Sequence, residues 1–315
     1  MKILLIGAKY LGHKRGVHNF RQHFFDEIGR QADLCFVGCE RQYKGIFQLG
    51  LQGIISHFYG NGKPDVIILF TIKKVRGLKG LEDFKGPIIL YECDSPTYVS
   101  KVRSFLQQQR NIRLLTFEFF PDLNNHYPVE KLWLPPTITF EDKNRGIERG
   151  LDVAHCGDYS SYKSWHPFRT RFAREILPLI KSFDIEIRGK NLKEIGRGSS
   201  PITSSKDLSL FANSAKVMLA FPTKNRWLTH QYFYPSANGC LTVGIKPQGF
   251  DEQMIPECLV EVREDFADLE EKVKYYLDNK KERDCLVQKA YKHIQEKHSV
   301  KVRVKTLLDK IKEIG

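Results

Sequence analysis

The fold of this chain is decided by residues 207–249, DLSLFANSAKVMLAFPTKNRWLTHQYFYPSANGCLTVGIKPQG. The pattern predicts a helix, a buried strand, a polar loop, a short helix closed by the small-residue turn at 237–239, and a second buried strand that ends at Gly244. Helices that alternate with continuously apolar strands are typical of a parallel sheet covered on both faces. The stretch therefore predicts an α/β fold.

The polar loop of this stretch carries positive charge. Lys224, Arg226 and His230 follow the first buried strand. In an open α/β sheet, ligands bind beyond the carboxyl ends of the strands, next to helix N-termini whose unpaired N–H groups attract phosphate. These three side chains are therefore candidates for binding an anionic group.

The rest of the chain repeats the alternation of strands and helices. Apolar runs predict strands at 2–7, 33–38, 65–70, 87–92, 113–118, 151–157, 184–189, 216–221, 240–244 and 258–262. Helical patterns occupy 19–30, 49–58, 97–109, 167–182, 207–215, 265–277, 280–297 and 300–314. This order predicts two Rossmann-like, doubly wound α/β domains with a cleft between them.

A proline pair and a charged stretch containing glycine, PPTITFEDKNRGIERG at 135–150, interrupt the alternation and predict a linker. We therefore expect one domain at residues 1–146 and a second at residues 147–315 that includes the C-terminal helices.

The composition, 41% hydrophobic and 28% charged, is typical of a globular protein. The apolar runs are strand-sized, so we expect no transmembrane segment, and with no secretory signal either we expect a cytoplasmic protein. The seven cysteines show no CxxC spacing, which favours reduced cysteines in the core.

Positive charge is spread over the whole chain. Lys and Arg number 50 against 37 Asp and Glu, a net charge of +13. Residues 1–150 hold 22 basic and 15 acidic side chains, an excess of +7, which leaves +6 for the remainder. Such a field attracts nucleic acid, an anionic membrane surface or phosphorylated substrates, and net charge alone does not choose among them.

The first predicted strand runs into a glycine-containing turn, GAKYLGHKRGVHNF at 7–20. Such a turn can let a substrate approach the backbone, and Lys14, Arg15 and His18 would then face the cleft. The turn lacks GxGxxG spacing, and glycine turns are also common after the first strand of any doubly wound fold.

The fourth predicted strand ends in YECDSP, which places Asp94 where the chain turns. A carboxylate at the carboxyl end of a strand can point into a cleft and act as a base. Asp before Ser-Pro is equally an ordinary way to open a turn.

The second predicted domain begins with LDVAHCGDY at 151–159, followed by the basic residues Lys163, His166, Arg169 and Arg171. Basic side chains beyond a glycine turn suit a diphosphate, and a solvated basic loop is the alternative. The aromatic side chains Tyr232 and Tyr234 could stack on a ligand ring or pack against the sheet. The histidines lack metal-ligand spacing, so we expect no metal site.

Several segments together resemble the GT-B glycosyltransferases of the spore-maturation-protein-B type. The resemblance rests on LWLPP at 132–136, on LDVAHCGDY, on the stretch at 207–249 and on the helical segment at 268–299. The chain is also similar to the phage β-glucosyltransferases, which add glucose to hydroxymethylcytosine in DNA. The resemblance is strongest from 151 to 298, and it implies an acceptor-side first domain and a second domain that binds a nucleotide sugar.

The resemblance makes Asp94 the match to the catalytic aspartate, the base that takes the proton of the acceptor hydroxyl. It implies no cofactor and a nucleoside-diphosphate sugar, a UDP-sugar, as co-substrate. The residues expected to bind this donor lie at strand ends and in the following loops: Gly157, Asp158, Tyr159, Lys163, Arg169, Arg188, Gly189, Lys224, Arg226, His230, Gln231 and Tyr234.

The chain departs from the family pattern at two of these positions. The family places Arg, which reaches the diphosphate, and Glu, which reaches the ribose, where this sequence has Gln231 and Tyr234. Lys224, Arg226 or His230 could replace the missing positive charge.

The leading hypothesis is a metal-independent GT-B glycosyltransferase whose acceptor is a hydroxymethylated base in double-stranded DNA, held near Lys14, Arg15 and His18. One alternative is transfer to a surface glycan or lipid. The other is a non-catalytic nucleotide- or DNA-binding protein on the same fold.

Overall fold

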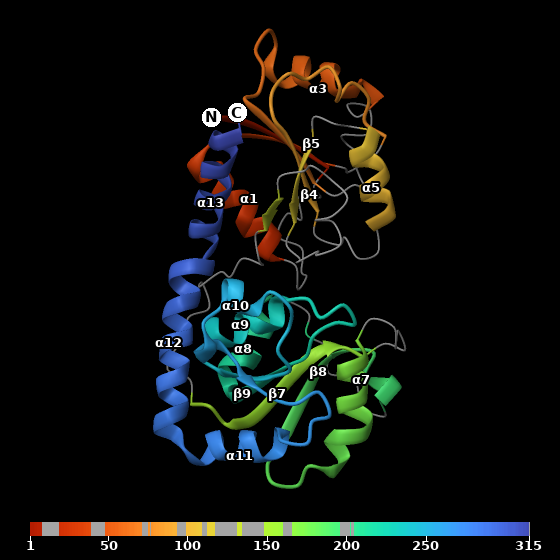
Figure 1. Ribbon diagram of the computed structural model, residues 1–315. Helices are drawn as coiled ribbons and strands as arrows, with labels where there is room; N and C mark the ends of the chain where they lie inside the picture. Colours follow the sequence, from red (N-terminus) through yellow and green to blue (C-terminus); the bar gives the residue numbers. More distant parts are fainter. Residues whose placement is uncertain are drawn as a thin grey trace. The chain divides into compact units, whose positions relative to one another are not determined.

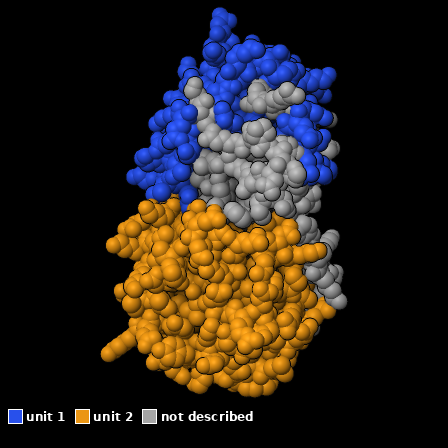
Figure 2. Space-filling view, in the orientation of Figure 1, with its two compact units in different colours: residues 1–14, 21–134, 300–315 blue, residues 15–20, 135–299 orange. Residues whose placement is uncertain are grey.

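The computed structural model divides the chain into two compact units (Figure 2). Unit 1 comprises residues 1–14, 21–134 and 300–315, and unit 2 comprises residues 15–20 and 135–299. The residues that the structure describes are 1–7, 19–38, 48–70, 75, 77–92, 99–108, 112–116, 131–133, 148–159, 166–195, 202 and 205–314. Each unit contains its own parallel sheet.

Unit 1 has six described strands in the order β2-β1-β3-β4-β5-β6, and every neighbouring pair is parallel. The strands are β1 (Lys2–Ile6), β2 (Asp33–Val37), β3 (Val66–Phe70), β4 (Ile88–Glu92), β5 (Ile112–Thr116) and β6 (Lys131–Trp133). The helices are α1 (Asn19–Gln31), α3 (Gly50–Tyr59), α5 (Val99–Gln108) and α13 (Val300–Ile314). In Figure 1, α1 and α13 lie on one face of the sheet and α5 on the other.

The C-terminal helix α13 lies in unit 1, which differs from the predicted domain division. Its buried side chains Val304, Leu307, Leu308 and Ile311 follow helical spacing. The Gln31 side chain of α1 donates to the carbonyl of Lys301 at 3.4 Å. The apolar stripe predicts that this helix is buried, but helical spacing carries no information about which sheet it covers.

Unit 2 has five described strands, all parallel, in the order β11-β10-β9-β7-β8. The strands are β7 (Leu151–Asp158), β8 (Ile185–Lys190), β9 (Ala215–Ala220), β10 (Leu241–Gly244) and β11 (Val260–Glu261). The longer helices are α8 (Ser205–Ser214), α11 (Leu269–Asp278) and α12 (Lys280–His298). The shorter ones are α7 (Pro167–Arg171), η6 (Leu192–Ile195), η7 (His230–Tyr232), α9 (Tyr234–Ala237), α10 (Phe250–Gln253) and η8 (Pro256–Cys258).

The order α8, β9, η7, α9, β10 matches the prediction for residues 207–249. The helix predicted at 167–182 is instead three short pieces: α7, the π-helix η4 (Phe172–Ile176) and the 3₁₀ helix η5 (Leu177–Leu179). Pro178 has no N–H for a helical hydrogen bond, and its ring clashes with the preceding turn. The chain therefore leaves the α conformation before this residue.

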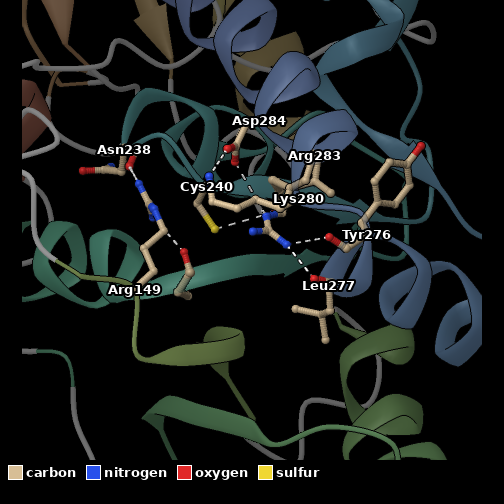
Figure 3. A network of polar contacts seen from close by, with 10 residues as sticks. Arg149, Asn238, Cys240, Tyr276, Leu277, Lys280, Arg283 and Asp284 are labelled. Atoms are coloured by element: carbon tan, nitrogen blue, oxygen red, sulfur yellow. Dashed lines mark hydrogen bonds and ion pairs between the residues drawn. The ribbon is translucent and has the colours of Figure 1, made fainter.

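Two arginines hold the end of unit 2 where its strands begin (Figure 3). Arg149 donates from Nη1 to the carbonyls of Ala212 and Ala215, at 3.2 and 2.7 Å, and from Nη2 to that of Asn238 at 2.8 Å. Arg283 donates to the carbonyls of Tyr276 and Leu277 at 2.6 and 3.0 Å. The last carbonyls of a helix lack hydrogen-bond partners within the helix. Arg149 supplies donors at the ends of α8 and α9, and Arg283 supplies donors at the end of α11.

Candidate functional site

The carboxyl ends of β7, β9 and β10 are neighbours, because β9 pairs in parallel with both of the other strands. Non-glycine residues with left-handed backbone lie in the loops after β8, β9 and β11: Asn191, Arg226 and Phe266 have φ values of 57°, 58° and 65°. Backbone strain of this kind is often found at functional sites. This edge is also where ligands bind in doubly wound sheets.

Arg169 is a buried cation at this edge. It belongs to α7, the helix that follows β7, and is only 6% exposed. A Cβ atom on Gly157 would lie 3.1 Å from Arg169 Nη1. Glycine at position 157 thus leaves the space in which the guanidinium lies against the end of β7.

The surroundings of Arg169 are neutral. Burial lowers its pKa, while Tyr159, Cys156 and the phenols of Tyr232 and Tyr234 act in the opposite direction. Within the described ranges, Arg169 has no carboxylate at ion-pair distance, and its Nε has no hydrogen-bond partner. An arginine remains charged in a protein, and burying an uncompensated charge is costly. The geometry therefore favours an anionic ligand here.

Gln231 lies at the same end of β7. Its Nε2 donates to the carbonyl of Cys156 at 2.5 Å, and the side chain is 8% exposed. The other amide atom, Oε1, is buried and has no hydrogen-bond partner in the described part of the chain. Gln231 and Arg169 thus present an unused acceptor and an unused donor beside neighbouring residues of one strand. Cys156 was not among the predicted site residues. The sequence feature that could have identified it is its position next to Gly157.

The two tyrosines considered as ligand contacts are buried. The Tyr234 hydroxyl lies 2.7 Å from Cys156 Sγ, and the Tyr232 hydroxyl donates to the carbonyl of Ile245 at 2.7 Å. Burial raises the pKa of both phenols. The geometry therefore favours packing against the sheet, the alternative considered for these side chains, and donor binding by Tyr234 stays a prediction.

His166, one of the basic residues predicted beyond the glycine turn, precedes α7. Burial, with a smaller effect from the nearby Arg169, lowers its pKa to about 4, while Asp158 acts to raise it. The imidazole is therefore neutral at pH 7. Asp158 accepts a hydrogen bond from Asn191 Nδ2 at 2.7 Å, so this carboxylate also belongs to the loops at the strand ends. Behind them, Tyr159 is buried with its hydroxyl hydrogen-bonded to His155 Nδ1.

Two of the predicted donor residues on β8 have structural contacts. Gly189 has a φ of 145°, and a Cβ atom there would lie 1.8 Å from the Gly157 carbonyl oxygen, so only glycine lets the two strands pair at this point. Arg188 pairs with Glu186 at 2.6 Å and its guanidinium lies 4.7 Å from the Phe211 ring centroid. No described contact joins Arg188 to Arg169.

The basic loop after β9 borders a cavity. Arg226 forms an ion pair with Glu264 and lines a cavity of about 490 Å³ together with residues 245–246 and 261–265. Lys224 is exposed, and His230 begins η7, one residue before Gln231. The structure thus brings Arg169, Gln231 and Gly157 together and leaves Lys224 at the surface.

Comparisons with known proteins support one architecture. The sequence model of the glycosyl transferase-like family matches residues 169–309. A comparison with characterised protein sequences gives no match. Among solved structures, an α-glucosyltransferase in complex with UDP and a 13-mer DNA containing an HMU base has a TM-score of 0.64 at 13% identity, with 99% of each chain covered.

Two further solved structures are similar in fold to this chain over nearly its whole length. Sucrose-phosphate synthase from Thermosynechococcus elongatus has a TM-score of 0.66 at 10% identity, covering 99% of this chain and 98% of the other. The DNA-modifying enzyme β-glucosyltransferase, solved with and without uridine diphosphoglucose, has a TM-score of 0.57 at 12% identity, with 99% of both chains covered. The chain has the GT-B fold. The resemblance predicted from the sequence is confirmed.

Several predicted residues lie outside the described part of this GT-B chain: Asp94, Lys14, Arg15, His18 and Lys163. Strand β4 ends at Glu92, two residues before Asp94, as the sequence pattern predicted. Within the described residues, no helix is long and apolar enough to cross a membrane. The same residues contain no group of three or more His, Cys, Asp and Glu side chains with metal-binding geometry.

Proposed function

We propose that this GT-B protein is a glycosyltransferase that moves a sugar from a nucleoside-diphosphate sugar, a UDP-sugar, to an acceptor hydroxyl. The observation that supports this most directly is the buried Arg169, which has no acidic partner in the described residues. A diphosphate would supply the missing negative charge, and charge-assisted hydrogen bonds to phosphate are among the strongest that arginine makes.

The proposed chemistry follows from the position of this charge. The bond between the anomeric carbon and the diphosphate oxygen breaks, and its electron pair leaves with the diphosphate. The acceptor oxygen forms the new bond to the anomeric carbon and loses its proton to a base, the role proposed for Asp94. Arg169 would stabilise the charge that develops on the leaving diphosphate. Because Gly157 leaves the guanidinium in contact with the end of β7, the charge is already in place before the substrate binds.

For the acceptor we propose a hydroxymethylated base in double-stranded DNA. The support is the net charge of +13, which suits a polyanion, and the fold shared with two glucosyltransferases that act on DNA or are bound to it. Transfer to a glycan or lipid would use the same donor site, so the acceptor is tested separately.

The donor is tested by adding a panel of nucleoside-diphosphate sugars to the protein and measuring the melting temperature and the release of nucleoside diphosphate without acceptor. We expect at least one UDP-sugar to raise the melting temperature and to be slowly hydrolysed. If no donor is consumed and none shifts the melting temperature, the enzyme proposal is wrong. Donor binding without hydrolysis or transfer would favour the non-catalytic alternative.

The acceptor is tested with duplexes that differ only in carrying cytosine or hydroxymethylcytosine. Mass spectrometry of the DNA after incubation with the active donor should show the added mass of one hexose per modified base in the hydroxymethylated duplex alone. Donor turnover with no product on either duplex would remove DNA as the acceptor and leave the glycan or lipid alternative.

A further inference from the structure

The amide of Gln231 has a defined orientation. A carbonyl oxygen only accepts hydrogen bonds, so the amide atom that faces the Cys156 carbonyl at 2.5 Å must be the nitrogen. Oε1 therefore points away from that carbonyl. This assignment needs no choice between two amide flips, since the opposite flip would place two acceptors against each other.

Oε1 of Gln231 is a buried acceptor with no partner in the described residues, on a side chain that is 8% exposed. Buried polar atoms are nearly always hydrogen-bonded in proteins, and an unsatisfied one needs an explanation such as a missing ligand. Another unsatisfied group at this strand end is Nε of Arg169, whose side chain is 6% exposed. Gln231 thus has a neutral acceptor, and Arg169 a charged donor, at the end of the same strand.

The acceptor restricts what the ligand can be. A diphosphate oxygen carries lone pairs and negative charge, so Oε1 would repel it, whereas Arg169 would attract it. The group opposite Oε1 must donate a hydrogen bond. In a nucleotide sugar, the rings on either side of the diphosphate are the ribose and the transferred sugar, and both carry hydroxyl groups.

We infer that Gln231 is a specificity residue: its Oε1 accepts a hydrogen bond from a ring hydroxyl of the nucleotide-sugar donor whose diphosphate is bound by Arg169. This inference rests on the proposed function. It adds that the site recognises a hydroxyl-bearing ring next to the diphosphate, so inorganic pyrophosphate alone does not satisfy it. A site that only collected phosphate would have no use for a fixed neutral acceptor.

The test measures binding of UDP, 2′-deoxy-UDP, 3′-deoxy-UDP, UDP-glucose and inorganic pyrophosphate by calorimetry. The proteins are the wild type, Gln231→Met, which keeps the side-chain volume without a strong acceptor, and Gln231→Leu as a second variant. Ser236→Ala is the matched control, because Ser236 is buried in the adjacent helix α9 and its hydroxyl faces Thr242 at 3.4 Å.

We expect both Gln231 variants to lower the affinity for UDP or UDP-glucose by about tenfold, which corresponds to the loss of roughly one buried hydrogen bond. The affinity for pyrophosphate should fall by less than about twofold. If the hydroxyl belongs to the ribose, one deoxy analogue binds the wild type as weakly as UDP binds Gln231→Met, and the variant weakens that analogue no further. If it belongs to the transferred sugar, only UDP-glucose is weakened. Ser236→Ala should bind all five ligands like the wild type.

Two results would overturn the inference while leaving the proposed function intact. One is unchanged binding of UDP and UDP-glucose by both variants, which would mean that Oε1 contacts no donor hydroxyl. The other is an equal loss for pyrophosphate, which would mean that Gln231 acts only by holding the end of β7. If the wild type bound none of the five ligands, the inference and the proposed function would both fail.

Discussion

At the scale of single residues, Arg169 has opposite consequences for folding and for binding. Its guanidinium is buried among tyrosines and a cysteine without a carboxylate partner in the described residues. Folding without a ligand must therefore desolvate a charge that nothing nearby neutralises. Part of the free energy of ligand binding compensates for that desolvation.

Replacing Arg169 with methionine should separate these two effects. We expect the free energy of unfolding to be unchanged or to rise by up to about 2 kcal/mol, because a buried charge is replaced by an apolar chain. UDP affinity should fall by between about 10- and 100-fold, the value of hydrogen bonds to a charged group. Urea unfolding and calorimetry measure the two quantities.

The matched control for that experiment is Arg171→Met. Arg171 lies in the same helix, is exposed and pairs with Glu175 at 3.3 Å, so its loss should change stability by less than about 1 kcal/mol and leave affinity unchanged. A large loss of stability in Arg169→Met with normal UDP binding would show that the guanidinium is structural.

The buried His155 and the half-buried His166 should make unit 2 sensitive to acid. Burial lowers the pKa of His166 to about 4 and the pKa of His155 well below its usual 6.5. Between pH 6.5 and about 4 the unfolded chain takes up protons at these positions while the folded chain does not, so the free energy of unfolding falls as the pH falls. In His166→Asn, urea unfolding should show a smaller loss across this window. An identical pH dependence in the two proteins would contradict the assignment.

At the scale of elements, Arg149 holds three segments of unit 2 through the carbonyls of Ala212, Ala215 and Asn238. Burial lowers its pKa. Arg149→Met would leave buried carbonyl oxygens without donors, which costs about 1–3 kcal/mol for each unsatisfied group. We expect a total loss of about 3 kcal/mol in urea unfolding. A loss below about 1 kcal/mol would mean that water replaces the guanidinium.

Helix α13 should stabilise unit 1 and not unit 2. Leu307→Ala removes a fully buried side chain, at a cost of about 2–4 kcal/mol. Hydrogen exchange measured by mass spectrometry should then increase in peptides from β1 and α1, with peptides from β7 and β9 unchanged. The exposed Lys305→Ala on the same helix is the control. Faster exchange confined to unit 2 would show that the helix stabilises the other sheet.

The elements could be predicted from the sequence where a single periodicity dominates. The stretch at 207–249 alternates apolar strands and polar segments so regularly that its order was confirmed. The helix at 167–182 was wrong in detail, since one proline outweighed an otherwise helical pattern. The strand β6, three residues long, was missed because so short a run has no recognisable period.

The site could be predicted only in part, because it depends on burial and orientation. Arg169 was predicted because it is a basic residue after a glycine turn. An exposed lysine at the same position would have given the same prediction. The surroundings of Arg169 include Tyr232 and Tyr234, which lie more than 60 positions away, so no local pattern reports them. The free oxygen of Gln231 likewise depends on a contact with Cys156, on another strand.

At the scale of the whole molecule, the net charge of +13 predicts salt-dependent association with duplex DNA. Each phosphate neutralised should contribute about −0.9 to the slope of log affinity against log salt. We expect a slope steeper than about −3. It is measured by fluorescence anisotropy with a labelled duplex, at salt concentrations from about 50 to about 300 mM. A slope near zero would argue against DNA as the acceptor. The surface double variant Lys101→Glu, Lys305→Glu reports on non-specific attraction.

The return of the chain to unit 1 at Val300 affects how the protein can be divided. If the chain were divided between residues 146 and 147, the carboxyl-terminal fragment would expose the apolar face of its last helix. The amino-terminal fragment would lack the helix that covers its sheet. Both fragments should aggregate during purification. Ending the carboxyl-terminal fragment at Ser299, and supplying residues 300–315 to its counterpart as a fused or added peptide, should give two well-behaved halves.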